Sequence, residues 1–174
     1  MRFVTQLVKE HIHGKTLDAG SGTTYDVILT SGLENVIRID KKKGKGIRQV
    51  DLNKIPFPFK NEEFDTVFCS HVLEHLDSPY LVLKEFKRIL KPNGTLIIAL
   101  PNPHFIFSQQ LSKQEHINLI CEKTMNLMLE KIGFEIIRKY RNWLFFKNTF
   151  FGRLCQYMPF FLQTDYWFIA ERVK

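Results

Sequence analysis

The stretch Thr16-Leu17-Asp18-Ala19-Gly20-Ser21-Gly22 decides the fold that this sequence predicts. Its first four residues are predicted as a short strand, and the glycines that follow predict a tight turn. A helix is expected next, from about residue 25 to residue 31, with Thr23 or Thr24 as its N-cap. Because glycine has no side chain, such a turn lets the backbone approach a ligand closely.

The rest of the chain alternates between predicted strands and helices. Further strands are expected at residues 35–40, 47–50, 64–70, 95–100, 134–140 and 166–173. Helices are expected at residues 3–12, from Ser78 to about Leu90, and in the apolar stretch that Gly133 closes. The residues after this second helix, 91–94, are predicted as its stop. This alternation predicts an α/β fold with a mostly parallel sheet and helices on both faces.

Polar and glycine residues follow the predicted strands where each strand ends. In a parallel sheet, ligands bind beyond the carboxyl ends of the strands. We therefore expect one rim to carry Asp18 to Gly22, Asp40, Asp51, Ser70 with His71, and Pro101 to His104.

Two acids on this rim indicate a nucleoside ligand. Asp40 lies 18 residues after Gly22, where a carboxylate suits the two hydroxyls of a ribose. Asp51 ends the next strand, where it would accept a hydrogen bond from the exocyclic amine of adenine. A phosphate-binding P-loop is excluded because no Gly-Lys-Ser/Thr follows the turn. The dinucleotide pattern G-x-G-x-x-G also fails, because its third glycine position is Tyr25.

These residues belong to a longer series of ordered motifs that resembles a known family. The motifs are Leu17-Asp18-Ala19-Gly20-Ser21-Gly22, Asp40, Asp51-Leu52, Ile55-Pro56-Phe57, Phe64-Asp65-Thr66-Val67, Val72-Leu73-Glu74-His75-Leu76 and Leu90-Lys91-Pro92-Asn93-Gly94-Thr95-Leu96. They resemble the class I S-adenosylmethionine-dependent methyltransferases, above all the small type 11 group, over residues 14–102. A weaker similarity continues to about residue 140.

The resemblance implies a fold, a cofactor and roles for the matching positions. The fold is a Rossmann-like three-layer sandwich with a terminal antiparallel strand, and residues 1–174 form a single domain. The cofactor is S-adenosylmethionine, and S-adenosylhomocysteine is the product. The resemblance implies cofactor binding by Asp18, Gly20, Ser21, Gly22, Asp40, Asp51, Leu52, Ser70 and His71. One departure is Thr24, which stands where such families often carry a third glycine.

Methyl transfer from a sulfonium needs an aligned acceptor and, for a protonated acceptor, a base. His71, His104 and His116 are the candidates, because histidine titrates near neutral pH. Each of them is also compatible with hydrogen bonding or packing alone. The spacing of His71, Glu74 and His75 suits a metal on a helical turn, but the same motif is common in the metal-free type 11 group. No metal is therefore predicted.

Composition leaves the acceptor open. The chain has 174 residues, a net charge of +7 and 13% aromatic residues. Six Lys or Arg residues lie in 38–48, which indicates a solvated face or a site for a phosphate-bearing substrate. An aromatic, basic insertion at about 141–164 indicates a lid, a hydrophobic substrate channel or a membrane-facing patch. We expect a small-molecule, glycan or lipid-linked acceptor, with peripheral membrane contact as a further expectation.

Other functions remain as alternatives. A nicotinamide-dependent oxidoreductase is disfavoured by the missing third glycine, and a nucleic-acid methyltransferase by the lack of a recognised nucleic-acid-binding motif. A non-catalytic methyltransferase-like binding module is the third alternative. The chain has three cysteines without metal-site or disulfide spacing, no signal-peptide pattern and no apolar run of membrane-spanning length. These features predict a cytoplasmic protein, and its oligomeric state is left open.

Overall fold

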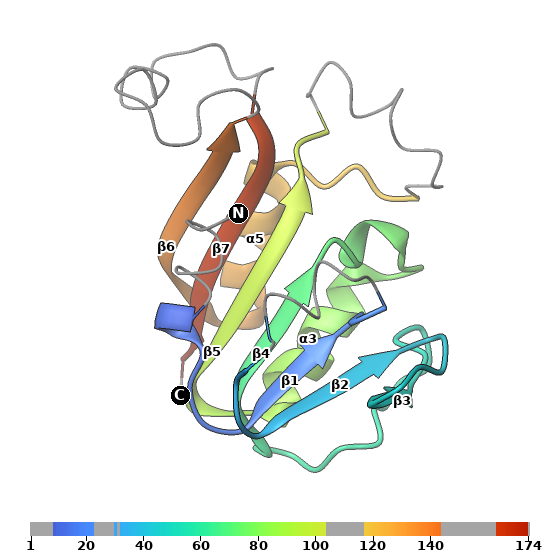
Figure 1. Cartoon of the computed structure of the whole chain (residues 1–174). Coiled ribbons are helices and arrows are strands. Elements are labelled where there is room, and N and C mark those ends of the chain that lie inside the picture. The colour runs from blue at the N-terminus through green and yellow to red at the C-terminus, as the bar shows by residue number, and fades with distance from the viewer. Residues whose placement is uncertain (1–8, 23–29, 31, 104–116, 144–162, 174) are drawn as a thin grey trace.

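The computed structural model describes residues 9–22, 30, 32–103, 117–143 and 163–173. Most of these residues form a seven-stranded sheet with helices packed on it (Figure 1). The strands are β1 (Thr16–Ala19), β2 (Val36–Asp40), β3 (Ile47–Gln49), β4 (Phe64–Ser70), β5 (Leu90–Pro101), β6 (Phe134–Trp143) and β7 (Gln163–Arg172). The helices are the short 3₁₀ turn η1 (Leu73–His75), α3 (Pro79–Ile89) and α5 (Glu122–Ile132).

The strand order in the sheet is β3-β2-β1-β4-β5-β7-β6. Strands β3, β2, β1, β4 and β5 pair in parallel, whereas β7 pairs antiparallel with both β5 and β6. The order reverses at β1, whose neighbours are β2 and β4. This is the topological switch point at which ligands bind in open α/β sheets. The topology confirms the mostly parallel α/β sandwich and the antiparallel end that the sequence predicts.

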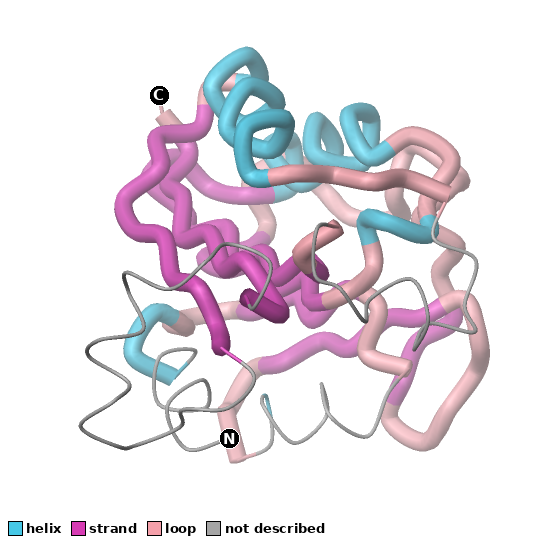
Figure 2. The backbone as a smooth tube through the Cα atoms, turned by 90° about the horizontal axis from the view of Figure 1, so that it is seen from above, coloured by secondary structure: helices cyan, strands magenta, loops and turns pink. Residues whose placement is uncertain are grey.

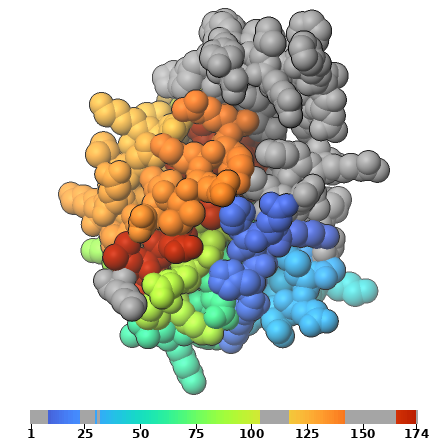
Figure 3. All heavy atoms as spheres, turned by 90° about the vertical axis from the view of Figure 1, so that its left-hand side faces the viewer, coloured from blue at the N-terminus to red at the C-terminus, as the bar shows by residue number. Residues whose placement is uncertain are grey.

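The two faces of the sheet are covered by different parts of the chain. Helices α3 and α5 lie together on one face, where the larger hydrophobic cluster includes Phe86 and Leu129 (Figure 2). The helical turn at residues 9–11 lies on the other face, beside β6 and β7 (Figures 1 and 3). A smaller cluster there contains Phe68 and Trp167, with Ile12 packed against it. No helix in the described ranges is long and apolar enough to cross a bilayer.

Most element boundaries agree with the sequence-based expectation to within three residues. The clearest error concerns residues 91–94, which are predicted as the stop of α3, and Leu90, which is predicted as part of the helix. They instead begin β5, and the pairing of β5 with β4 is irregular between Phe64 and Thr66. The glycine stop of α5 is confirmed, because Gly133 has φ 92° and donates to Leu129 O. The expected helices at residues 3–12 and 25–31 lie largely outside the described residues.

A partly buried ion pair between Glu85 and Arg88 anchors the segment that links β3 to β4. Glu85 on α3 is 8% exposed and accepts hydrogen bonds from Arg88 Nε and Nη2 at 2.9 and 2.8 Å. It also accepts the backbone N–H of Phe57 at 2.8 Å. Arg88 in turn donates to the carbonyls of Phe57 and Phe59. The Arg88 hydrogen bonds, together with the Phe57 amide, hold the pKa of Glu85 below its ordinary value.

A second buried hydrogen bond joins β7 to the end of β5. The Tyr166 hydroxyl donates to Asn102 Oδ1 at 2.8 Å, and both residues are buried. Burial, reinforced by the Glu122 carboxylate, raises the pKa of Tyr166 to about 12, so the phenol stays neutral. The contact fixes the two antiparallel strands where they approach the ligand-binding rim.

We expect Glu85→Gln to lower the free energy of unfolding by about 1.5–3 kcal/mol at pH 7, because the charge-assisted hydrogen bonds weaken. A carboxyl whose pKa is lowered in the folded state stabilises the protein above its ordinary value of 4.5. That contribution is lost as the pH falls through the lowered pKa. Urea unfolding measured between pH 7 and pH 3 should therefore show that the difference in the free energy of unfolding between variant and wild type becomes smaller as the pH falls. A difference that stays constant over this range would contradict the assignment.

Candidate functional site

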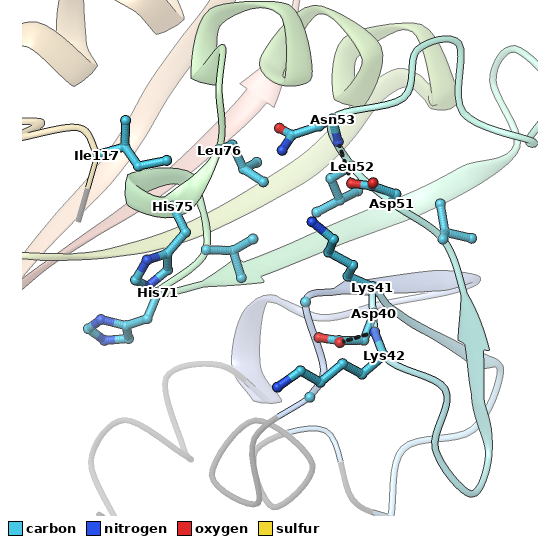
Figure 4. Close-up of a pocket in the computed structure, with 14 residues that line it drawn as sticks. Asp40, Lys41, Lys42, Asp51, Leu52, Asn53, His71, His75, Leu76 and Ile117 are labelled. Carbon is cyan, nitrogen blue, oxygen red and sulfur yellow. Dashed lines mark hydrogen bonds between the residues drawn. The ribbon is translucent and has the colours of Figure 1, made fainter. Parts of the chain in front are cut away.

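A cavity of about 670 Å³ opens at the carboxyl ends of β1, β2 and β3 (Figure 4). The turn after β1 contributes Gly20 and Gly22, and the end of β2 contributes Asp40. The segment after β3 contributes Asp51 and Leu52. The far wall comes from His71, Val72, His75 and Leu76, and from Ile117. The structure thus brings the predicted glycine turn and both predicted acids to one cavity.

The glycine turn is shaped by a close approach to the segment after β4. Gly20 has φ +86°, and a Cβ built on it would overlap the Val72 side chain. The amides of Gly20 and Ser21 both donate to Ile39 O on β2, at 2.9 and 3.0 Å. Position 20 therefore requires glycine for two reasons: its positive φ disfavours any residue with a Cβ, and Val72 leaves no space for one.

Asp18 lies beneath this turn and holds it together. Its side chain is 1% exposed, and Oδ2 accepts hydrogen bonds from Ser21 Oγ at 3.0 Å and from Thr30 Oγ1 at 2.7 Å. Arg38 Nε lies 4.0 Å from the same oxygen. Neither Asp18 nor Ser21 lines the cavity. Their contacts favour a supporting role for both residues over direct contact with a ligand.

Asp40 presents its carboxylate to the cavity (Figure 4). One oxygen, Oδ1, accepts the backbone N–H of Lys42 at 2.7 Å. The other, Oδ2, lies 2.5 Å from where a Cβ on Gly22 would be. Gly22 therefore leaves room for this carboxylate, and the two residues form a cradle of bare backbone beside an acid. This geometry suits the paired hydroxyls of a ribose.

Asp51 and Leu52 lie on the same side of the cavity as Asp40. Asp51 Oδ1 accepts the backbone N–H of Asn53 at 3.1 Å, which fixes the turn that follows β3. Leu52 is 5% exposed and supplies an apolar wall. A carboxylate next to an apolar wall suits the amine edge and the face of an adenine ring. The cradle and this wall together fit an adenosyl group, with the ribose at Asp40.

His71 lies on the opposite wall, at the end of β4. It has φ +53°, an uncommon conformation for a residue with a Cβ, and its amide donates to Ala99 O at 3.0 Å. Its side chain is 37% exposed and lines the cavity. The preceding residue, Ser70, is buried and does not line the cavity, and its Oγ makes no hydrogen bond within the described residues.

Two carboxylates flank the His71 ring. Nδ1 lies 3.7 Å from Glu74 Oε1, and Nε2 lies 3.6 Å from Asp165 Oδ1. Glu74 is 2% exposed and also lies 4.0 Å from His75 Nε2. Two histidines on the cavity wall thus share one buried carboxylate. The two ring nitrogens of His71 therefore each face a carboxylate oxygen, which orients the ring on the cavity wall.

The remaining candidates have different outcomes. His104 and His116 lie outside the described residues, so their roles as bases stay a prediction. Of the insertion expected at about 141–164, the first three and last two residues belong to β6 and β7, and residues 144–162 lie outside the described ranges. Within the described ranges, no group of three His, Cys, Asp or Glu side chains is arranged to hold a metal ion.

Eight residues that line the cavity were not among the predicted site residues. They are Lys41, Lys42, Val50, Asn53, Val72, His75, Leu76 and Ile117. The two lysines directly follow Asp40, and Asn53 directly follows Leu52, so adjacency to predicted site residues was a usable signal. Ile117 gave no such signal, because it lines the cavity only as a result of the tertiary contact between residues 117–120 and η1.

Comparison with known proteins agrees with this geometry. Residues 17–98 match the family model described as a methyltransferase domain. Uncharacterized protein MJ1123 of Methanocaldococcus jannaschii is 26% identical over 147 residues, which cover 76% of this chain and 71% of that protein. Demethylmenaquinone methyltransferase of Staphylococcus saprophyticus is 31% identical over 85 residues, 47% of this chain and 36% of that enzyme. The chain thus spans about a third of the length of the menaquinone enzyme.

A solved structure shows the same fold over nearly the whole chain. The S-adenosylmethionine-dependent methyltransferase from Archaeoglobus fulgidus superposes with a TM-score of 0.73 at 20% identity, covering 98% of this chain and 94% of that one. The domain match covers the glycine turn, Asp40, Asp51 and the whole η1 segment. Residues 17–98 are therefore similar to a methyltransferase domain, and the chain has the fold of an S-adenosylmethionine-dependent methyltransferase.

Proposed function

We propose that this chain, as a single domain, moves a methyl group from S-adenosylmethionine to a small-molecule or lipid-linked acceptor. The observation that carries the proposal is the cradle formed by Gly22 and the Asp40 carboxylate, in one cavity with Asp51. Asp40 would bind the ribose hydroxyls. Asp51 and the amide of Leu52 would bind adenine, and Gly20 and Gly22 would face the ribose and methionine portion.

The cofactor supplies an activated methyl group on a sulfonium, so the protein's task is to align the acceptor. The wall opposite Asp40 would do this, since His71, His75 and Ile117 line it. His71 would take the acceptor's proton, with Glu74 and Asp165 stabilising the resulting imidazolium. Buried Ser70 and Asp18 would support the cofactor site from behind, through the positions of His71 and Ser21.

The acceptor side of the cavity favours an apolar molecule. Ile117 is 63% exposed although it lines the cavity, and its neighbour Asn118 is fixed to η1 by two hydrogen bonds. The Asn118 amide donates to Glu74 O at 3.0 Å, and Asn118 Nδ2 donates to Leu76 O at 2.6 Å. An exposed aliphatic side chain held at a cavity mouth suits a hydrophobic ligand. The similarity to a demethylmenaquinone methyltransferase supports the same acceptor class. The cytoplasmic location stays a prediction.

We expect Asp40→Ala to weaken S-adenosylhomocysteine binding by about tenfold or more, since the ribose would lose charge-assisted hydrogen bonds. Isothermal titration calorimetry measures this directly and needs no acceptor. Glu130→Ala is the matched control, because Glu130 is an exposed acid on α5. Equal affinities in Asp40→Ala and wild type would contradict the ribose assignment.

Gly22→Ala tests whether the cradle acts through Asp40. The added methyl would displace the Asp40 carboxylate, which is 2.5 Å away. Position 22 has no positive φ, so we expect little loss of stability. Gly22→Ala should weaken S-adenosylhomocysteine binding in the wild-type background by roughly as much as Asp40→Ala, about tenfold. In the Asp40→Ala background, Gly22→Ala should lower the affinity for S-adenosylhomocysteine by a markedly smaller factor. If the two substitutions instead lower the affinity additively, the added methyl obstructs the ligand directly, which would contradict the proposal.

A further inference from the structure

A cluster of exposed basic side chains, without acidic partners among the described residues, begins at the cavity mouth with Lys41 and Lys42. We call Lys41, Lys42, Lys43, Lys45 and Arg48 the basic loop. All five are exposed, and within the described residues none of them forms an ion pair with a carboxylate. In contrast, Lys91, Lys139 and Arg141 pair with acids at 2.7 to 3.3 Å. The basic loop is therefore a concentrated positive charge that the described fold does not neutralise.

The basic loop is an ordered part of the fold. The Ile47 amide donates to Gly44 O at 3.1 Å, and Gln49 Nε2 donates to Lys41 O at 3.1 Å. The Arg48 guanidinium lies over the Phe59 ring, 5.3 Å from its centroid. Two members, Lys41 and Lys42, also line the cavity. Lys41 and Lys42 thus present their charge at the cavity mouth, and the other members follow in the same hydrogen-bonded stretch of chain, so little conformational entropy is lost when the loop binds.

An exposed aliphatic side chain, Ile117, lies on the other side of the same cavity. Figure 4 shows Ile117 across from Lys41 and Lys42. Ile117 and Leu119 are 63% and 65% exposed, and the hydrogen bonds of Asn118 hold the segment between them. A mouth with lysines on one side and an exposed aliphatic residue on the other, with exposed Leu119 two residues along the chain, is the pattern of a surface that lies on a membrane.

We propose that this mouth docks on an anionic lipid surface, with the basic loop against phosphate headgroups and Ile117 and Leu119 in the headgroup–acyl boundary. The proposal rests on the proposed function, because it delivers a lipid-linked acceptor to the cavity. Lysines near a bilayer gain binding energy from anionic lipids. Aliphatic residues add binding energy when they are buried in the bilayer. Proteins that bind single-stranded RNA instead use aromatic side chains that stack on the bases. The described mouth therefore fits a lipid surface better than RNA.

The test is cosedimentation of the full chain with vesicles of phosphatidylcholine alone or with about 30% phosphatidylglycerol. We expect binding to the anionic vesicles alone, and weaker binding when the salt rises from about 0.1 to 0.5 M. The variant Lys43→Ala/Lys45→Ala should bind at least tenfold more weakly, since each lysine contributes about fivefold. The matched control Lys84→Ala/Lys131→Ala removes two exposed lysines from α3 and α5 and should change binding less than twofold.

Leu119→Asp tests the aliphatic half of the mouth and should weaken vesicle binding while leaving S-adenosylhomocysteine affinity unchanged. Equal binding to neutral and anionic vesicles, no binding to either, or equal loss in the control variant would overturn the proposal. So would tight binding to a single-stranded RNA oligonucleotide that Lys43→Ala/Lys45→Ala abolishes while vesicles stay unbound. Calorimetry with S-adenosylhomocysteine on the same proteins separates the two proposals. A protein that binds the nucleoside but no vesicle contradicts only the membrane proposal.

Discussion

The approach of the β1 turn to the end of β2 is the constraint on which the site depends. Parallel pairing sets Ala19 beside Ile39, so the turn after β1 passes directly over the carboxylate that ends β2. The amides of Gly20 and Ser21 share one carbonyl of β2, and Gly22 leaves the space that the Asp40 side chain occupies. This contact places glycine backbone and the Asp40 carboxylate side by side, so a ligand can bind to both at once.

The surrounding structure keeps that contact in place. Asp18 ties the turn to Thr30 with buried hydrogen bonds, and Val72 packs where a Cβ of Gly20 would be. Val72 belongs to the same short segment as His71 and η1, so the cradle and the opposite wall are positioned by one packing contact. The Glu85–Arg88 pair fixes the chain between β3 and β4 from the helical face. The cavity is thus supported from both of its sides by elements of the sheet and of α3.

The sequence predicts the fold and half of the site, and the limit has a physical cause. Strand periodicity, glycine turns and acids at strand ends are local signals, so the parallel sheet and the rim with Asp40 and Asp51 were predictable. The supporting role of Asp18 is harder to predict, because it depends on a buried hydrogen bond from Thr30, twelve positions along the chain. The pairing of His71 with Asp165 joins residues 94 positions apart and leaves no local pattern. The exposed Ile117 depends on Asn118 folding back on η1, which is a tertiary contact.

Thermal unfolding of the wild-type chain tests the central claim most directly, with S-adenosylmethionine, S-adenosylhomocysteine and the nicotinamide dinucleotides compared side by side. A ligand at 100 times its dissociation constant stabilises the folded state by about 2.7 kcal/mol. For a chain of this length that raises Tm by roughly 5–11 °C. The account predicts such a rise with the two adenosyl sulfur compounds alone. No rise with either of them, or an equal rise with a nicotinamide dinucleotide, would contradict it.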